Sequence, residues 1–195
     1  MLSLQMNGQQ QVGWIEQPMP EPKAGEVVIR TAMSALCGSE LGRYRGDGMA
    51  QGNTGHEAAG TVVAVGEGVA EPKVGQRVGV SAIAGCGHCD YCANKQYTWC
   101  PKRKFYGSMH AEYFTASALA CHVLPDDLSW EIGVLLTGDG FGVPYHTSTK
   151  FRSGDVRNVA IFGAGPIGLG SVIMQTYLKR RVIIVDFSAE RLAIA

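Results

Sequence analysis

Short apolar segments separated by turn residues fill the chain up to about residue 125. Gly, Pro or Asn interrupts them about every eight to twelve residues, which is typical of an all-β barrel. The segments 26–34 (EVVIRTAMS) and 58–65 (AAGTVVAV) are rich in β-branched residues and bounded by glycine, so both predict strands. Asn7-Gly8 predicts the turn of a hairpin.

The pattern changes near residue 130, where Ser129 is placed to cap a helix over 130–136. From residue 158 the sequence reads NVAIFGAGPIGLGSVIMQTYLKRRVIIVD, which predicts an apolar strand, a glycine turn, a helix and a second apolar strand. Strands that are apolar throughout are typical of a parallel sheet covered on both faces. We therefore predict an α/β chain, with a β-rich domain over 1–150 and the first βαβ unit of a nucleotide-binding domain over 151–195.

One βαβ unit is shorter than a complete doubly wound domain of about five or six strands. The sequence ends at residues 191–195, within what reads as a new helix. We therefore expect residues 1–195 to be the N-terminal part of a longer protein.

The charge balance excludes some partners. Seventeen Lys and Arg residues balance seventeen Asp and Glu residues, with no run of like charge, which argues against a nucleic-acid partner. No segment approaches the roughly 18 apolar residues of a membrane span, and residues 1–11 lack the basic leader and apolar core of a signal peptide. We expect a cytoplasmic protein with no membrane partner.

Four of the six cysteines fall within residues 86–100, CGHCDYCANKQYTWC, the segment called the cysteine lobe below. Where thiols are kept reduced, such a cluster is more typical of a metal site than of disulfides. Cys86, Cys89, Cys92 and Cys100 form C-x2-C-x2-C-x7-C, a spacing that lets one loop surround a tetrahedral zinc ion. A closed shell of four sulfurs leaves no position for substrate, so we predict a structural zinc.

Two alternatives for the cysteine lobe stay open. The cysteines could be free or disulfide-bonded, or they could hold an iron–sulfur cluster. Cys100-Pro101 matches the proline that follows the last ligand of ferredoxin-like motifs, which supports the second alternative.

Three further candidate positions lie beside glycines: Cys37, His56 with Glu57, and Asp139. Each has an ordinary structural explanation when taken singly. A single cysteine is usually a small buried residue, a histidine a hydrogen-bonding ring, and an aspartate a helix cap or turn former. Their chemistry becomes specific only in combination with other motifs.

A dinucleotide fingerprint follows the predicted strand at 158–162. Gly163, Gly165 and Gly168 form G-x-G-x-x-G, and Asp186 ends the next predicted strand. The glycines allow the backbone and the helix start at Pro166-Ile167 to approach a pyrophosphate, while the acid accepts hydrogen bonds from ribose hydroxyls. The negative charge of Asp186 would repel a 2′-phosphate, so NAD is favoured over NADP.

The order of these motifs resembles the zinc-dependent medium-chain alcohol and polyol dehydrogenases, and the resemblance extends over the whole chain. The matching motifs, in order, are Cys37-Gly38-Ser39, Gly55-His56-Glu57, the cysteine lobe, the Gly-Asp-Gly-Phe segment at 138–141, and Gly163 to Gly168. The resemblance implies a GroES-like β-barrel catalytic domain followed by a Rossmann domain, of which only the beginning is present.

The resemblance also implies a catalytic zinc bound by Cys37, His56 and Asp139. Glu57 would stand behind the ion or join its ligands during exchange, and Ser39 would take the proton from the substrate. One position departs from the family pattern. Many relatives carry a proton-transferring His three residues after the hydroxyl residue, whereas this chain has Gly42, with Tyr44 nearby.

Taken together, the resemblance implies an enzyme that transfers a hydride between a secondary alcohol or polyol and NAD. It implies two zinc ions per chain, a small-molecule substrate, Arg191 beside the cofactor ribose, and a homodimer or homotetramer at full length. Residues 1–195 alone are expected to be inactive. The alternative is a zinc-stabilised, non-catalytic binding or redox-sensing module of the same fold.

Overall fold

The computed structural model describes residues 1–151 and 154–195 of the chain. It divides into two compact units, Met1–Val134 and Leu135–Ala195. Among the described residues, no helix combines the length and the apolar character needed to cross a membrane.

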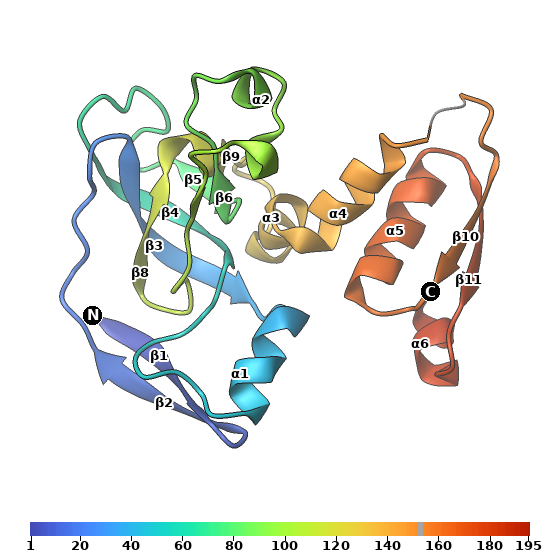
Figure 1. Cartoon of the computed structure of the whole chain (residues 1–195), viewed down its shortest axis with the longest axis horizontal. Helices are drawn as coiled ribbons and strands as arrows, with labels where there is room; N and C mark the ends of the chain where they lie inside the picture. Colours follow the sequence, from blue (N-terminus) through green and yellow to red (C-terminus); the bar gives the residue numbers. More distant parts are fainter. Residues whose placement is uncertain (152–153) are drawn as a thin grey trace. The chain divides into compact units, whose positions relative to one another are not determined.

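The first unit is built on a five-stranded antiparallel sheet with the order β8-β3-β4-β5-β9 (Figure 1). Its strands β3 and β4 confirm the two strands predicted from the sequence. Two short two-stranded sheets accompany it. The strands are β1 (Leu2–Gly8), β2 (Gln11–Glu16), β3 (Glu26–Ala35), β4 (Glu57–Val65), β5 (Arg77–Val80), β6 (Ile83–Ala84), β7 (Lys104–Phe105), β8 (Tyr113–Ser117) and β9 (Cys121–Val123).

The core of this unit follows from the two-residue period of its strands. Adjacent residues of a strand point to opposite faces of a sheet. Accordingly, Ala58 belongs to the main cluster and Ala59 to a second cluster with Leu124 and Val134, so apolar residues cover both faces. The main cluster contains Val27, Ile29, Ala58, Val62, Val78, Val80, Ala84, Met109, Phe114, Ala116 and Ala120. Their burial supplies the main driving force for folding.

Short helices connect the strands. They are η1 (Gly38–Glu40), α1 (Leu41–Arg45), α2 (Asp90–Ala93), η2 (Tyr97–Trp99), η3 (Ala118–Ala120) and α3 (Trp130–Thr137). The helix predicted over 130–136 is confirmed by α3, and the hydroxyl of Ser129 accepts a hydrogen bond from the N–H of Ile132 at 3.4 Å.

The first hairpin exists, but its turn is not at Asn7-Gly8. The turn is formed by Gln9 and Gln10, which have φ angles of 52° and 63°. Gly8 ends β1, where a Cβ would lie 2.4 Å from the carbonyl oxygen of Gly46. A glycine is therefore needed here for close approach to the segment after α1, as well as for its positive φ of 79°.

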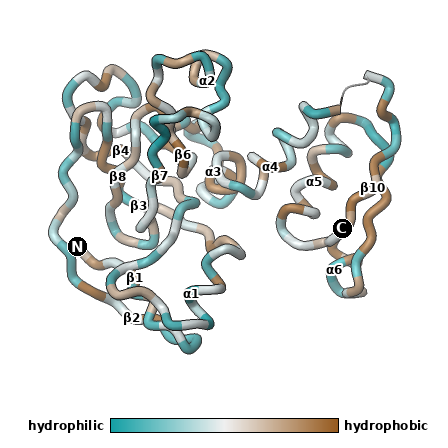
Figure 2. Tube along the Cα trace, viewed as in Figure 1, coloured by the Kyte–Doolittle hydropathy of each residue, from teal (hydrophilic) through white to brown (hydrophobic). Residues whose placement is uncertain are grey.

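The second unit confirms the predicted βαβ arrangement. It contains α4 (Asp139–Ser148), β10 (Asn158–Phe162), α5 (Pro166–Tyr177), β11 (Arg181–Val185) and α6 (Ala189–Ile194). Strands β10 and β11 are parallel, from Asn158 beside Arg181 to Phe162 beside Val185. Figure 2 shows β10 in the brown of hydrophobic residues. Large apolar side chains such as Phe162 and Ile183 are nevertheless exposed in this chain.

The division after Val134 lies earlier than the change near residue 150 expected from the sequence. The difference arises from α4, which packs against α5. A Cβ on Gly170 of α5 would lie 2.2 Å from the carbonyl oxygen of Gly140 in α4, so the two helices approach closely at glycine. This contact joins residues 139–148 to the βαβ unit.

Candidate metal and dinucleotide sites

The four cysteines of the lobe bring their sulfurs to one point. The distances between Sγ atoms are 3.9 Å for Cys86 and Cys92, 3.6 Å for Cys89 and Cys92, and 3.7 Å for Cys89 and Cys100. Tetrahedral zinc with Zn–S bonds of about 2.3 Å requires sulfurs about 3.8 Å apart. Disulfide-bonded sulfurs would be about 2.05 Å apart. The donor set and spacing therefore fit one tetrahedral ion.

The surroundings of the lobe shift the pKa values of two of its thiols in opposite directions. The backbone N–H of His88 is the largest influence on Cys86 and helps to lower its pKa to about 6. The N–H of Cys92 lowers the pKa of Cys89, but burial and the neighbouring thiols outweigh it and raise that pKa to about 11. These two thiols therefore differ in how easily they lose a proton. Zinc binds thiolates, so its binding would release the protons that remain on the sulfurs.

A second group of possible ligands lies at the end of the β3–β4 pair. Ala35 is directly opposite Glu57 in the antiparallel register. Cys37 follows β3 by two residues and His56 precedes β4 by one, so the same register brings them together. One ligand atom from each of Cys37, His56 and Glu57 lies within 4.8 Å of the others.

The ring of His56 is oriented by its own loop. Its Nδ1 lies 2.8 Å from the carbonyl oxygen of Thr54, which accepts a hydrogen bond. Nδ1 therefore carries the proton, and Nε2 presents the lone pair that a metal requires. A thiolate, an imidazole nitrogen and a carboxylate are ligands that zinc accepts.

The other residues predicted for catalysis are distributed over three helices. Ser39 lies in η1 and is exposed, and Gly42 and Tyr44 lie in α1. Asp139 is the first residue of α4, in the second unit, and its role as a metal ligand stays a prediction. The term mixed site is used below for Cys37, His56 and Glu57, together with Asp139 as a proposed further ligand.

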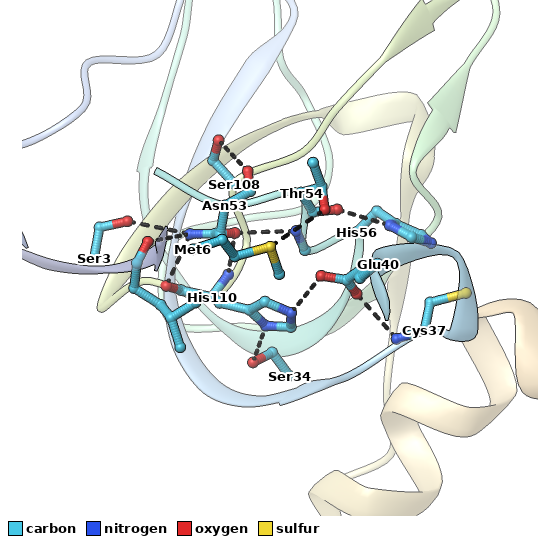
Figure 3. Close-up of polar contacts among 12 residues, drawn as sticks. Ser3, Met6, Ser34, Cys37, Glu40, Asn53, Thr54, His56, Ser108 and His110 are labelled. Carbon is cyan, nitrogen blue, oxygen red and sulfur yellow. Dashed lines mark hydrogen bonds and ion pairs between the residues drawn. The ribbon is translucent and has the colours of Figure 1, made fainter. Parts of the chain in front are cut away.

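The sequence analysis missed a buried polar network behind Cys37 and His56 (Figure 3). Glu40 Oε1 accepts the backbone N–H of Cys37 at 2.9 Å, and Glu40 Oε2 lies 2.9 Å from His110 Nε2. Burial opposes ionisation of Glu40, but hydrogen bonds from His110 and Cys37, with the charges of His110 and His56, lower its pKa. The carboxylate is therefore an ionised acceptor inside the fold.

The same network reaches the loop before β4 through Asn53. Its side-chain Oδ1 accepts the N–H of Gly55 at 3.0 Å and that of His110 at 3.2 Å. The spacing of Cys37 and Glu40, an N-cap residue and an acid three positions later, is a sequence signal that could have revealed Glu40. Single histidines and asparagines carry no comparable signal.

An open cleft lies beside His56. The ring centroids of His56 and Phe105 are 5.8 Å apart with the planes tilted by 53°. Phe105 lies opposite Ile83 in the β6–β7 pair, and Arg103 precedes it by two residues. The cleft has a volume of about 350 Å³ and is lined by Ile83, Pro101, Arg103, Lys104 and Phe105.

The glycine turn of the second unit has the geometry that its motif predicts. Gly163 has a φ of 102°, which favours glycine, and a Cβ on Gly168 would lie 1.8 Å from the carbonyl oxygen of Gly163. Gly165 is the N-cap of α5, and Pro166 and Ile167 are its first two residues. The first turn of α5 therefore packs directly against the glycine turn at Gly168, where a side chain would collide with the backbone.

Asp186 follows β11 and is hydrogen-bonded to the glycine turn. Its Oδ2 accepts the N–H of Ala164 at 2.6 Å, and its Oδ1 accepts that of Ser188 at 2.8 Å. These bonds, that from Ser188 first, lower the pKa of the carboxyl, and the charge of Arg191 in α6 adds to the effect. The acid is therefore ionised beside the turn.

The alcohol dehydrogenase GroES-like domain family matches residues 23–126, which include β3, β4, the cysteine lobe and His110. The chain belongs to the medium-chain dehydrogenase family. This membership accounts for the five-stranded sheet with an inserted cysteine lobe followed by a βαβ unit, and it confirms the fold class expected from the sequence.

Three of the proteins similar to this chain are named as dehydrogenases. D-arabitol-phosphate dehydrogenase from Enterococcus avium is 33% identical over 205 residues, which cover 100% of this chain and 58% of the relative. L-threonine 3-dehydrogenase from Mesorhizobium japonicum is 34% identical, over 93% of this chain and 56% of the relative. The crystal structure of galactitol-1-phosphate dehydrogenase from Escherichia coli has a TM-score of 0.86 and 32% identity, over 100% of this chain and 58% of that one.

The chain thus spans less than two thirds of the length of these relatives. The cofactor, substrate and oligomeric state of the whole protein stay predictions.

Proposed function

We propose that this chain is the catalytic part of a zinc-dependent oxidoreductase that transfers a hydride between a secondary alcohol or polyol and NAD. The observation that carries the proposal is the convergence of Cys37, His56 and Glu57 at the end of the β3–β4 pair. Asp139 is proposed as the third zinc ligand, and Glu57 stands behind the ion or replaces a ligand during exchange.

Zinc at the mixed site would supply a Lewis acid that makes an alcohol easier to deprotonate near neutral pH. The chain supplies the groups around it. The ring orientation of His56 is fixed by Thr54, and the Ser39 hydroxyl, two residues after Cys37, is proposed to take the substrate proton. Gly42 has no side chain to pass that proton on, so its route to solvent differs from that of relatives with a His there.

The second unit is proposed to bind NAD, which would accept the hydride. Gly163, Gly165 and Gly168 let the backbone approach a pyrophosphate at the start of α5, where Pro166 and Ile167 lie. Asp186 would exchange its bond to the turn for ribose hydroxyls, with Arg191 beside them. Its ionised carboxylate disfavours the 2′-phosphate of NADP.

The cleft beside His56 suggests the class of alcohol. Two basic side chains, Arg103 and Lys104, line it together with Phe105. Basic side chains beside apolar ones favour a substrate with an anionic substituent, such as a phosphate. Two relatives are named for phosphorylated polyols, in agreement with this choice.

A substrate panel tests the proposal. A longer product of the same gene should reduce NAD when given secondary alcohols, polyols and their phosphates, read as NADH absorbance, with a smaller rate for NADP. Residues 1–195 alone should give no turnover, because most of the nicotinamide-binding half is absent from them. Activity of residues 1–195, or no reduction of NAD by the longer protein with any alcohol, would contradict the proposal.

The second candidate is a zinc-stabilised binding or redox-sensing module. Gly42, in place of a proton-transferring residue, is the observation that favours it. Zinc content separates the two candidates, since one ion per chain supports the module and two support the enzyme. Reversible oxidation of the lobe thiols with loss of the ion would indicate redox sensing.

A further inference from the structure

His110 contacts both of the loops that carry the proposed zinc ligands of the first unit. It lies between β7 and β8, and its Nε2 donates a hydrogen bond to Glu40 Oε2 at 2.9 Å. Its Nδ1 lies 2.9 Å from the hydroxyl of Ser34 on β3. The other side of the ring lies against Gly55, where a Cβ would be 2.6 Å from His110 Cδ2.

On the Cys37 side, His110 acts through Glu40. The Glu40 side chain is 0% exposed and that of His110 is 10% exposed. A buried carboxylate is stable only if it is paired and hydrogen-bonded, so the bonds to His110 and to the Cys37 N–H fix its position. Since Glu40 holds the Cys37 backbone, fixing the carboxylate fixes the start of η1 (Figure 3).

On the His56 side, His110 acts through the backbone. Gly55 immediately precedes His56, and no side chain other than that of glycine leaves room for the imidazole ring. The Asn53 side chain, which is buried, ties the N–H groups of Gly55 and His110 to one oxygen. The ring and the loop of His56 are therefore held at a fixed distance.

We propose that His110 is a positioning residue for the mixed site, which sets the spacing of Cys37 and His56 by bracing Glu40 on one side and Gly55 on the other. The inference rests on the proposed function, because it assumes that these two residues bind zinc. Ligands held in place before the metal arrives bind it more tightly, and loss of an outer hydrogen-bonding partner typically costs about 10–100-fold in metal affinity.

Two substitutions separate the hydrogen bonds of His110 from its packing. His110→Phe keeps a ring against Gly55 but removes both hydrogen bonds, so Glu40 loses a partner. His110→Gln places an amide donor within reach of Glu40 but removes the ring. We expect His110→Phe to release zinc from the mixed site about 10–100-fold faster, and His110→Gln to recover part of the loss.

The readout is zinc release from the holoprotein to a chromogenic chelator, followed over time. The mixed site, with an open position, should empty in the fast phase and the cysteine lobe in the slow phase. The lobe is an internal reference, because a merely structural role for His110 would accelerate both phases. His122→Phe, which removes an exposed histidine of β9, is the matched control and should release both ions at the wild-type rates.

The inference holds if His110→Phe accelerates only the fast phase and His110→Gln lies between it and the wild type. It fails if both phases are unchanged or if both accelerate together. A wild-type protein that releases only the lobe ion would refute the proposed function itself, and this inference with it. Wild-type release in two phases, both insensitive to His110, would refute this inference alone.

Discussion

The cysteine lobe and the mixed site are two ways of assembling candidate metal ligands in one fold. All four sulfurs of the lobe come from fifteen consecutive residues, with only very short helices between them. In the mixed site, Cys37 comes from a segment distant in sequence from His56 and Glu57, and they meet because β3 pairs with β4. We therefore expect the lobe to depend on a bound ion for its shape, and the mixed site to depend on the sheet.

The two sites also differ in the buried side chains that surround them. Few apolar side chains of the lobe are buried, and Trp99 and Tyr91 are exposed, so a zinc ion would replace a hydrophobic core. The mixed site is backed by buried Glu40 and Asn53 and by His110. We therefore expect an ion in the lobe to stabilise the lobe, and an ion in the mixed site to be held by the residues around it.

The largest expected effect is on the lobe. Cys92→Ser removes a buried ligand, so the lobe should lose its ion and the midpoint of thermal unfolding should fall more than for any other substitution considered. Cys121→Ser is the matched control, because burial raises the pKa of that thiol to about 12 and it lies outside the lobe. A Cys92→Ser protein with wild-type stability would show that the lobe does not need an ion.

His56→Ala should reduce activity rather than stability, the opposite of Cys92→Ser. The mixed site should lose its ion, and a longer product of the gene should lose its activity. The midpoint of thermal unfolding should change little, because the β3–β4 pair does not depend on the metal. Enzyme assays and thermal unfolding on the same preparations check this. Unfolding as severe as that of Cys92→Ser would remove the distinction between the two sites.

Asp139 tests the ligand that comes from the second unit. Asp139→Ala should weaken zinc binding at the mixed site, whereas Asp139→Cys should retain it, since zinc also accepts a thiolate. Asp127→Asn, on the loop before α3, serves as the control. Equilibrium dialysis against zinc measures the change, and equal affinities for wild type and Asp139→Ala would exclude this residue from the ligands.

The smallest expected effect concerns the cleft beside His56. Arg103→Ala should raise KM for a phosphorylated polyol roughly tenfold, because a hydrogen bond to a charged group contributes about 1.5 kcal/mol. KM for the same polyol without phosphate should not change. Lys102→Ala, one residue away, is the control. A similar rise for both substrates would show that Arg103 does not recognise the anionic group.

Features encoded by neighbouring residues could be predicted from the sequence. The β-branched segments of β3 and β4, the glycine turn before α5 and the spacing of the lobe cysteines each carry their signal within a few residues. The resemblance to known dehydrogenases placed these features in one family, and the family match confirms that membership.

Features that depend on contacts between distant residues could not be predicted. The pairing of Glu40 with His110 joins residues 70 positions apart, and a single histidine has no pattern that reveals its partner. The role of Gly8 was misread for the same reason, since its need for glycine comes from the segment at Gly46 rather than from the turn. The packing of α4 on α5 likewise appears only when the glycines of two helices meet.

Zinc counting is the most direct test of the claim that one fold holds two different metal sites. Elemental analysis should find two zinc ions per wild-type chain, one in Cys92→Ser, one in His56→Ala and none in the double variant. One ion in the wild type, retained in His56→Ala and lost in Cys92→Ser, would contradict the catalytic site and leave only the zinc-stabilised lobe.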